Sequence, residues 1–231
     1  MSAEPRPYWR SAAEDEVMQE EHVFVWNAMV DTVNTDLAGR RVLDAGCNRG
    51  GFLRLLYDRC GIAEGYGYDP AAGAIEDARR LIARRALHFE VADSVPPSWR
   101  DFDAAFSHEV LYLLHDLSTH AAAVYAALAP GASYYAVMGV HDGSPLMAEW
   151  HRAHAAELEL PGLHRIDDVV EVFQAVGFGA AVSRLRIGFI PAAGHDGDAG
   201  ARSDPGPRLM RWLEYYNDHK LLLRFTRPVA G

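Results

Sequence analysis

The sequence is poor in lysine and cysteine and contains no long hydrophobic run. Lys220 is the only lysine, so 21 of the 22 basic residues are arginines. We interpret this bias, together with the abundance of alanine, as a feature of genome composition and attach no mechanism to it. The two cysteines, Cys47 and Cys60, are too few for the disulfide framework of a small secreted protein.

No stretch approaches the roughly 20 consecutive apolar residues that a transmembrane helix needs. Residues 1–21 carry charges, prolines and a tryptophan where a signal peptide would have its apolar centre. We therefore expect a cytoplasmic protein with no membrane partner.

Acidic residues outnumber basic ones by 32 to 22, which gives a formal net charge of -10. Duplex nucleic acids are bound by basic faces that neutralise phosphates, so this balance argues against a nucleic-acid partner. A solvated helix face is the better interpretation of the cluster Arg79, Arg80, Arg84 and Arg85. The expected partner is a small molecule, and the sequence leaves a homodimer open.

Hydrophobic periodicity predicts an alternation of strands and helices. The predicted strands are residues 40–45, 65–68, 87–92, 102–107, 133–138, 181–190 and 220–226. The predicted helices are residues 13–34, 50–59, 71–85, 117–128, 145–159, 166–176 and 209–216. Strands that alternate with helices require crossover connections, hence a mostly parallel sheet with helices on both faces. We expect an α/β, Rossmann-like fold of seven strands with an N-terminal helical extension.

The strongest local pattern is VLDAGCNRGGFLRLL, residues 42–56. A buried strand ends at Asp44, a turn with Gly46 and Gly50 follows, and a helix begins. Ligands of such folds lie outside the carboxyl ends of the strands. A dinucleotide fingerprint needs a glycine where Asn48 stands, and the Asp44 carboxylate would repel a pyrophosphate. The pattern therefore disfavours a nicotinamide oxidoreductase and suits a ligand with an ammonium and a sulfonium group.

Acidic and polar residues also end the next predicted strands. Asp69 ends the second strand, where a carboxylate can accept hydrogen bonds from ribose hydroxyls. Asp93 ends the third strand and could accept from an adenine amino group, and Ser107 ends the fourth. Each residue alone could be a helix cap or a turn, but their succession at strand ends is hard to obtain by chance.

With these motifs, the sequence resembles class I S-adenosylmethionine (SAM)-dependent methyltransferases over about residues 36–139. The glycine-rich motif of that family often reads D-x-G-x-G-x-G, and Asn48 replaces its middle glycine. The last two predicted strands resemble the family's antiparallel closing pair. The resemblance implies SAM as the cofactor, and no metal is needed because the sulfonium is already a good leaving group.

The resemblance also implies roles for single residues. Asp44, Gly46 and Ser107 would lie near the methionine part of SAM. Asp69 would bind the ribose, and Asp93 would lie near the adenine. The full set of expected cofactor-binding residues is Asp44, Gly46, Cys47, Asn48, Gly50, Asp69, Pro70, Asp93, Ser94 and Ser107.

We expect a single methyltransferase domain over residues 1–231. Residues 1–35 would form a helical lid, 36–139 the SAM-binding core, and 140–231 the acceptor side with the closing strands. Aromatic side chains at Tyr8, Trp9 and Trp26 could close over the cofactor or pack in the core. Residues 191–207 are rich in Gly, Pro and Asp, which predicts a surface loop or a second lid.

Methyl transfer is an in-line displacement that needs alignment and, for some acceptors, a base. His108 follows the fourth strand and His141 follows the fifth, so these two are the candidate catalytic residues. His108 could instead line the cofactor or pack, and His141 could be a solvated loop residue. The candidate substrate-binding residues are Glu109, Tyr112, Asp142 and Trp150, although Tyr112 and Trp150 could serve only in packing.

A metal site is an alternative, because His151 and His154 stand three apart on a predicted helix and could join His141. No cysteine or acidic pattern supports it, so we expect no metal.

The leading hypothesis is a SAM-dependent methyltransferase that acts on a small molecule, such as a secondary metabolite. Methylation of a macromolecule is the alternative, although the amino-methylating motif N/D-P-P-Y/F is replaced by S-H-E-V after the fourth strand. The Pro-Cys pair of cytosine C5 methyltransferases is missing as well. A SAM-binding protein without turnover also stays open.

Overall fold

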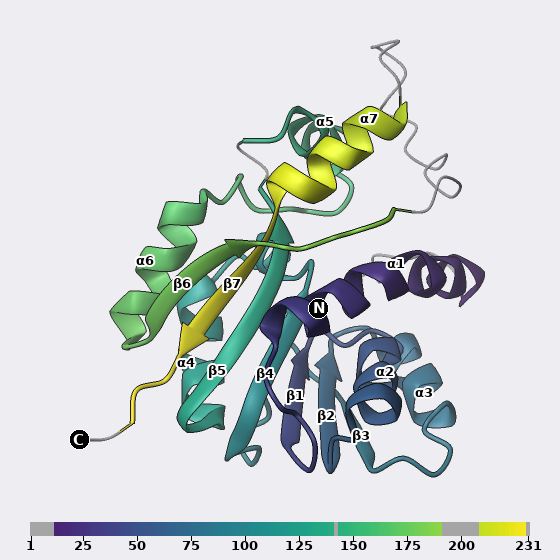
Figure 1. Cartoon of the computed structure of the whole chain (residues 1–231), viewed down its shortest axis with the longest axis vertical. Coiled ribbons are helices and arrows are strands. Elements are labelled where there is room, and N and C mark those ends of the chain that lie inside the picture. Colours follow the sequence, from purple (N-terminus) through teal and green to yellow (C-terminus); the bar gives the residue numbers. More distant parts are fainter. Residues whose placement is uncertain (1–11, 141–142, 191–207, 230–231) are drawn as a thin grey trace, which may run out of the picture.

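The computed structural model of the chain describes residues 12–140, 143–190 and 208–229. Its centre is a seven-stranded sheet in the order β3-β2-β1-β4-β5-β7-β6 (Figure 1). The strands are β1 (Arg41–Ala45), β2 (Glu64–Asp69), β3 (Leu87–Val91), β4 (Phe102–His108), β5 (Leu128–Gly139), β6 (Gly179–Arg184) and β7 (Lys220–Thr226).

Strands β1 to β5 are parallel to one another, and β7 is antiparallel to both β5 and β6. This topology confirms the expected Rossmann-like sheet with an antiparallel closing strand. The strand order reverses between β1 and β4, because β1 leads to β2 on one side while β4 and β5 continue on the other. A crevice at the carboxyl ends of the strands forms at such a switch point and is where ligands of this fold bind.

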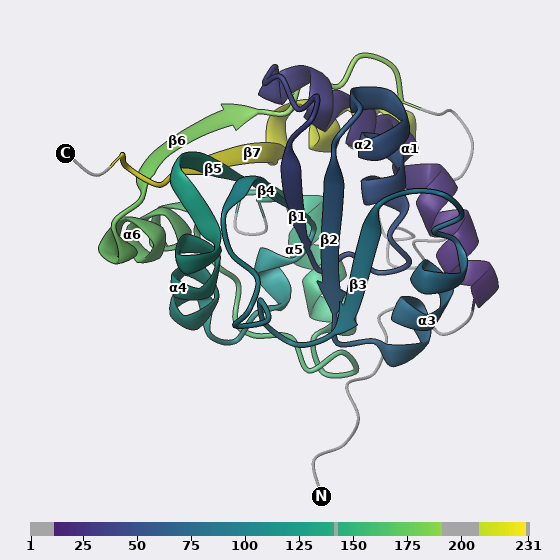
Figure 2. The same cartoon turned by 90° about the horizontal axis from the view of Figure 1, so that it is seen from below.

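The helices cover both faces of the sheet (Figure 2). They are α1 (Ala12–Val33), α2 (Gly51–Cys60), α3 (Ala72–Arg80), α4 (Leu117–Ala127), α5 (Pro145–His154), α6 (Ile166–Val176) and α7 (Arg208–Glu214), with the 3-10 turn η1 (Leu111–Leu113) and the π-helical turn η3 (Tyr215–His219). Helices α1, α2 and α3 cover one face, and α4 and α6 cover the other. None of the helices in the described ranges is long and apolar enough to cross a membrane.

Two hydrophobic clusters fill the space between sheet and helices, one on each face. Along β1, Val42 belongs to the cluster under α1 to α3, and Leu43 belongs to the cluster under α4 and α6. Both side chains are fully buried. Burial of one such side chain contributes about 1.5–3 kcal/mol. A strand buried on both faces has to be apolar at successive positions, which explains the short run that predicts β1.

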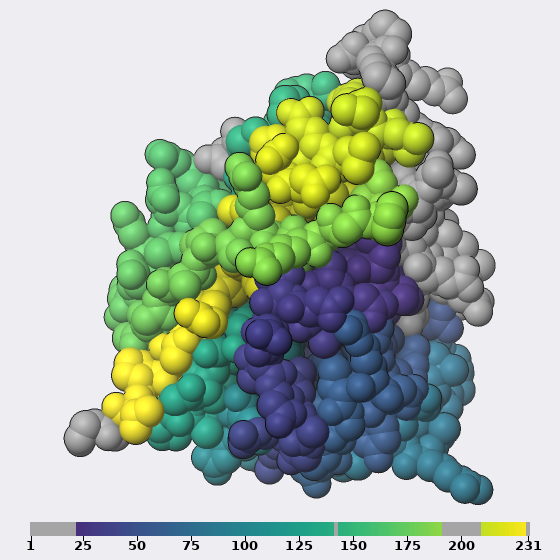
Figure 3. Space-filling model, viewed as in Figure 1, coloured from purple at the N-terminus to yellow at the C-terminus, as the bar shows by residue number. Residues whose placement is uncertain are grey.

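Helix α1 lies against α2 on one side and against residues 185–190 on the other (Figure 3). The backbone amide of Arg186 donates to Thr32 Oγ1 at 3.2 Å, and the ring of Phe24 meets that of Tyr216 edge to face at 5.2 Å. The N-terminal helix is therefore joined to the C-terminal part of the chain across the sheet face.

Four predicted boundaries were wrong. The helix predicted over 145–159 ends at His154, because residues 155–159 form turns and Glu159 has φ +51°. The helix predicted over 71–85 ends at Arg80, where a non-helical turn with Ala83 at φ +54° follows. The strand predicted over 181–190 spans Gly179–Arg184, since its partner β7 begins at Lys220 and offers nothing to pair with beyond Leu185. Leu185 and Ile187 keep their apolar character because they pack into the core beside α1.

Strand β5 begins at Leu128, five residues before the predicted start at 133. The pairing with β4 shifts register between Phe102 and Ala104, so the stretch containing Pro130 and Gly131 forms an irregularity within the strand. Regular pairing resumes at Ser133, which is where the sequence pattern places the strand.

Candidate cofactor and acceptor site

The loop after β1 has three residues in the left-handed backbone region. The φ angles are +74° at Gly46, +46° at Asn48 and +69° at Gly50. A Cβ atom on Gly46 would lie 2.5 Å from Val110 Cγ2, and one on Gly50 would lie 2.4 Å from Phe89 Cζ. Both glycines are thus required by conformation and by close packing.

Asn48 stands at the position of the family's middle glycine and has a left-handed backbone conformation. Asparagine is among the few non-glycine residues that tolerate a left-handed conformation. The backbone amide of Asn48 donates to Asp69 Oδ2 at 2.9 Å, which joins the loop after β1 to the end of β2. The residue that departs from the glycine motif therefore still adopts a conformation that glycine allows.

This explanation predicts that one substitution at position 48 preserves ligand affinity and that another lowers it. Asn48→Gly should leave the affinity for S-adenosylhomocysteine within about twofold. Asn48→Val should lower it by roughly tenfold, because a left-handed L-residue costs about 1–2 kcal/mol and valine is especially crowded there. Calorimetric titration measures both.

Ala83 offers a matched control, since it also has positive φ and is exposed on a turn after α3. Ala83→Val should lower the melting temperature with little effect on affinity. Equal affinities for the glycine and valine variants at position 48 would refute the explanation.

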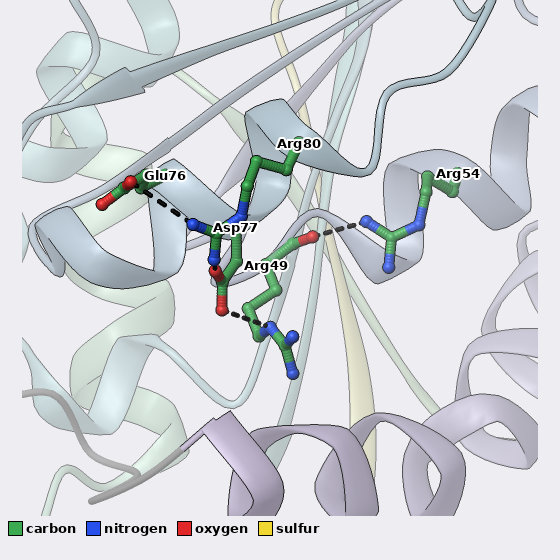
Figure 4. A network of polar contacts seen from close by, with 5 residues as sticks. All are labelled: Arg49, Arg54, Glu76, Asp77 and Arg80. Carbon is green, nitrogen blue, oxygen red and sulfur yellow. Dashed lines mark hydrogen bonds and ion pairs between the residues drawn. The ribbon is translucent and has the colours of Figure 1, made fainter.

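A polar network fixes the same loop to two helices (Figure 4). Arg49 Nε lies 3.0 Å from Asp77 Oδ2 of α3, and both side chains are mostly buried. Asp77 also pairs with Arg80, and Arg54 Nη1 of α2 donates to the backbone oxygen of Arg49 at 2.5 Å. These contacts hold the loop in one conformation before a ligand binds. Sequence reasoning missed them, because nothing in the pattern marks Arg49 and Asp77 as neighbours.

Asp69 is held by two backbone hydrogen bonds at the end of β2. Its Oδ1 accepts from Ala71 N and its Oδ2 from Asn48 N, both at 2.9 Å. Burial raises the pKa of Asp69, and these two hydrogen bonds lower it in part. Each oxygen retains a second lone pair that could accept from a hydroxyl group. The carboxylate is therefore held in one orientation and can accept hydrogen bonds from the hydroxyl groups of a ligand.

Asp44 is the most perturbed acid of the site. Its side chain is buried at the end of β1, and no described residue forms a hydrogen bond with it. Burial, reinforced by repulsion from Asp69, raises the pKa of Asp44 to about 8. A cation placed beside it would remove this penalty, since an opposite charge favours the ionised carboxyl. The position fits the ammonium and sulfonium groups of SAM.

The other predicted cofactor residues lie at or beside the carboxyl ends of the strands, but the side chains of Cys47 and Ser107 point into the protein. Pro70, Asp93 and Ser94 follow β2 and β3, and the amide of Ala92 donates to the backbone oxygen of Asp69 at 3.1 Å. The buried thiol of Cys47 packs against Gly67 of β2, since a Cβ atom on Gly67 would lie 2.7 Å from Cys47 Sγ.

Ser107 points into the core. Its Oγ lies 2.5 Å from the Tyr134 hydroxyl, which lies 3.1 Å from His120 Nε2 in the cluster under α4. Burial raises the pKa of Tyr134 and lowers that of His120 to about 4, so this network stays neutral. The side chain of Ser107 thus supports β4 from below, and its backbone borders the sheet edge.

His108, the last residue of β4, lies on the opposite face beneath α1. Its Nδ1 is 3.3 Å from the indole nitrogen of Trp26, which can only donate. Nδ1 is therefore the acceptor, and Nε2 carries the proton. Burial lowers the pKa of His108 well below the usual histidine range, with further lowering from Lys220 and His22. The imidazole is neutral, and its buried Nε2 has no hydrogen-bond partner.

Glu109 and Lys220 form a buried ion pair beside His108. Lys220 Nζ lies 2.8 Å from Glu109 Oε1. The contact is electrostatic, because Oε1 has no hydrogen bond of good geometry. The lysine side chain is 3% exposed and that of the glutamate 16%. The sequence analysis named Glu109 as a candidate but did not name Lys220. The fact that Lys220 is the only lysine of the chain could have pointed to it.

The remaining predicted residues lie around this centre or outside the described ranges. Tyr112 contacts Trp150 of α5 edge to face at 5.8 Å, so the two form one wall next to the segment after β4. His141 and Asp142 are outside the described residues. His151 and His154 each contact a backbone oxygen, of Pro161 and Trp150 respectively. Within the described ranges, no three His, Cys, Asp or Glu side chains gather as a metal site would require.

The strand order, the glycine-rich loop and the two acids at the switch point define a class I SAM-dependent methyltransferase. The sequence model of a methyltransferase domain family matches residues 18–180, which is more than half of the chain. The protein therefore belongs to this methyltransferase domain family. SAM is the cofactor of this class, and the residues at the sheet edge fit it.

Solved structures support the same fold. A putative methyltransferase from Haloferax volcanii, solved with the Trm112 methyltransferase activator, is 22% identical with a TM-score of 0.76 and covers 94% of this chain and 95% of its own. A SAM-dependent methyltransferase from Mesorhizobium loti is 18% identical with a TM-score of 0.67, covering 89% and 98%. Geranyl diphosphate C-methyltransferase from Streptomyces coelicolor A3(2) is 17% identical with a TM-score of 0.67, covering 96% and 86%. No curated protein matches the sequence.

Proposed function

We propose that this methyltransferase transfers the methyl group of SAM to a small-molecule acceptor in the cytoplasm, by in-line displacement. The observation that carries the proposal is the pair of acids at the switch point. Asp69 accepts from the amide of Asn48, and Asp44 is buried with no counter-ion among the described residues. A small acceptor is supported by the acidic net charge of -10 and by the S-H-E-V sequence after β4. One structural neighbour, geranyl diphosphate C-methyltransferase, is named for a small-molecule substrate.

In this proposal Asp69 binds the ribose hydroxyls, and Asp44 faces the charged methionine part. Asp93 and Ser94 lie toward the adenine, and the loop of Gly46 to Gly50 lies against the cofactor. The acceptor would enter between α1, α5 and the segment after β4, where Tyr112 and Trp150 form a wall. His141 is the base that the sequence predicts, and it lies outside the described residues. Because its Nε2 carries the proton, His108 is better suited to donate a hydrogen bond to the acceptor than to accept a proton from it.

Calorimetric titration with SAM, S-adenosylhomocysteine and NAD tests the proposal, with Asp69→Ala as the variant. The wild type should bind the first two at micromolar concentration and should not bind NAD. Asp69→Ala should bind SAM about 10–100-fold more weakly, since a hydrogen bond to a charged group contributes about 1.5–3 kcal/mol.

Asp167→Ala is the matched control, because Asp167 lies on α6 with its side chain 82% exposed. It should leave all affinities unchanged. Binding of NAD alone, or full SAM affinity in Asp69→Ala, would contradict the assignment. Radiolabelled SAM incubated with a panel of acceptors then separates an enzyme from a SAM-binding protein without turnover.

A further inference from the structure

Lys220, the only lysine of the chain, has its ammonium group packed beside two tyrosine rings. The chain uses arginine at every other basic position, and the genome bias inferred from the sequence would favour arginine here too. Lys220 is the first residue of β7 and pairs with Gly139, the last residue of β5. Its Nζ lies 5.4 Å from the ring centre of Tyr215 and 5.3 Å from that of Tyr216. A planar guanidinium is larger and cannot replace an ammonium enclosed in this way.

The aromatic walls come from an unusual backbone. Tyr215 and Tyr216 begin the π-helical turn η3, and π-helical turns frequently occur at functional sites. A Cβ atom on Gly139 would lie 2.6 Å from the Tyr215 hydroxyl, so the glycine makes room for that side chain. Gly139 at the end of β5 and the two tyrosines of η3 thus border the lysine.

Glu109 is the partner of this lysine and directly precedes Val110, which packs against the cofactor loop. It has φ +57°, a left-handed conformation that glutamate rarely adopts, and its amide donates to Val137 O of β5 at 2.8 Å. The next residue, Val110, touches Gly46, the first glycine of the loop. Strained backbone of this kind persists where the surrounding structure holds it, commonly at active sites.

We propose that Glu109 is the general base of the methyl transfer, that Lys220 positions it, and that the acceptor atom is a hydroxyl oxygen. This inference rests on the proposed function. Lys220 holds Oε1, which leaves Oε2 of the partly exposed carboxylate to receive a proton. Glu109 takes the hydroxyl proton as the oxygen forms its bond to the methyl carbon. The carbon–sulfur bond breaks, and its electron pair stays on sulfur.

His108 is the reason for choosing oxygen over nitrogen. Its protonated Nε2 is a buried donor without a partner, and Lys220 is a common neighbour of His108 and Glu109. An acceptor atom held by both residues must accept from His108, donate to Glu109 and still attack the methyl group. A hydroxyl oxygen has two lone pairs and can do all three, whereas an amine nitrogen has only one.

The single lysine allows a direct test. Protein labelled with [13Cε]lysine gives one labelled lysine signal, which reports on Lys220 alone. The labelled protein is saturated with S-adenosylhomocysteine and then titrated with phenol and, in a separate experiment, with aniline. Phenol should shift the signal saturably, with a response at least threefold larger than that of aniline. An absent phenol response, or an equal response to aniline, would overturn the proposal.

The variant Glu109→Gln adds a second readout. It should weaken phenol binding by roughly tenfold while the affinity for S-adenosylhomocysteine stays within about twofold. Unchanged phenol binding would remove Glu109 from the site. If the variant does not fold, the comparison of phenol with aniline on the wild type still decides. Failure of the proposed function is distinguishable, because S-adenosylhomocysteine itself would then not bind.

Discussion

Replacing Asp44 with asparagine should stabilise the ligand-free protein and at the same time weaken SAM binding at least tenfold. In the folded protein, burial and the charge of Asp69 raise the pKa of Asp44 to about 8, above its ordinary value of 3.8. Folding therefore favours the protonated form. The stability that this form contributes is fully present below pH 3.8 and is lost as the pH rises toward 8.

Asparagine is neutral at every pH and avoids this loss. At pH 7 the free energy of unfolding of Asp44→Asn should exceed that of the wild type by an amount on the order of a few kcal/mol. The difference should vanish near pH 4. Urea denaturation at several pH values measures it, with Asp168→Asn on the exposed side of α6 as the control. A variant that is less stable than the wild type at pH 7 would refute this account of Asp44.

For SAM binding, in contrast to stability, the wild type should be favoured over Asp44→Asn. SAM carries an ammonium and a sulfonium group, which would lower the pKa of Asp44 and release its proton near neutral pH. Calorimetry in buffers of different ionisation enthalpy should detect up to one proton released per SAM bound by the wild type, and none by Asp44→Asn. The same carboxyl would then reduce stability and supply cofactor affinity, a common trade-off at functional sites.

The second large effect concerns the pair of Glu109 and Lys220. Lys220→Met should lower the free energy of unfolding by about 3–5 kcal/mol, because it leaves a buried carboxylate without its counter-charge. In a domain of this size, that loss corresponds to a fall in melting temperature of roughly 10 °C. Adding Glu109→Gln should recover most of it, since two neutral side chains can occupy the buried site without the desolvation cost.

The exposed pair of Arg40 and Asp103 is the natural comparison. Its atoms approach to 3.3 Å, but the two side chains are 54% and 36% exposed. Arg40→Met should therefore cost less than about 1 kcal/mol. Thermal and urea denaturation of the single and double variants measure the coupling. Equal losses for Lys220→Met and Arg40→Met would show that burial of the Glu109 and Lys220 pair has no energetic consequence.

Sequence patterns predicted much of the fold because the relevant information is local. The run that ends at Asp44 and the last strand, residues 220–226, depend on apolar residues at successive or alternating positions. The boundary at 181–190 was wrong because it depends on the length of β7, a partner distant in the chain. The early start of β5 was missed because a register shift with β4 lets the strand continue through Pro130 and Gly131.

By itself, the sequence determined the order of strands and helices, the glycine-rich loop and the acids at the ends of β1 and β2. Each of these follows from local periodicity or from a backbone conformation that glycine and asparagine tolerate. The tertiary structure alone decided the proton position on His108, set by Trp26 of α1, and the pairing of Glu109 with Lys220. The first feature depends on the packing of α1 against the end of β4. The second depends on the placement of β7 beside β5. Both bring residues from distant parts of the chain into contact.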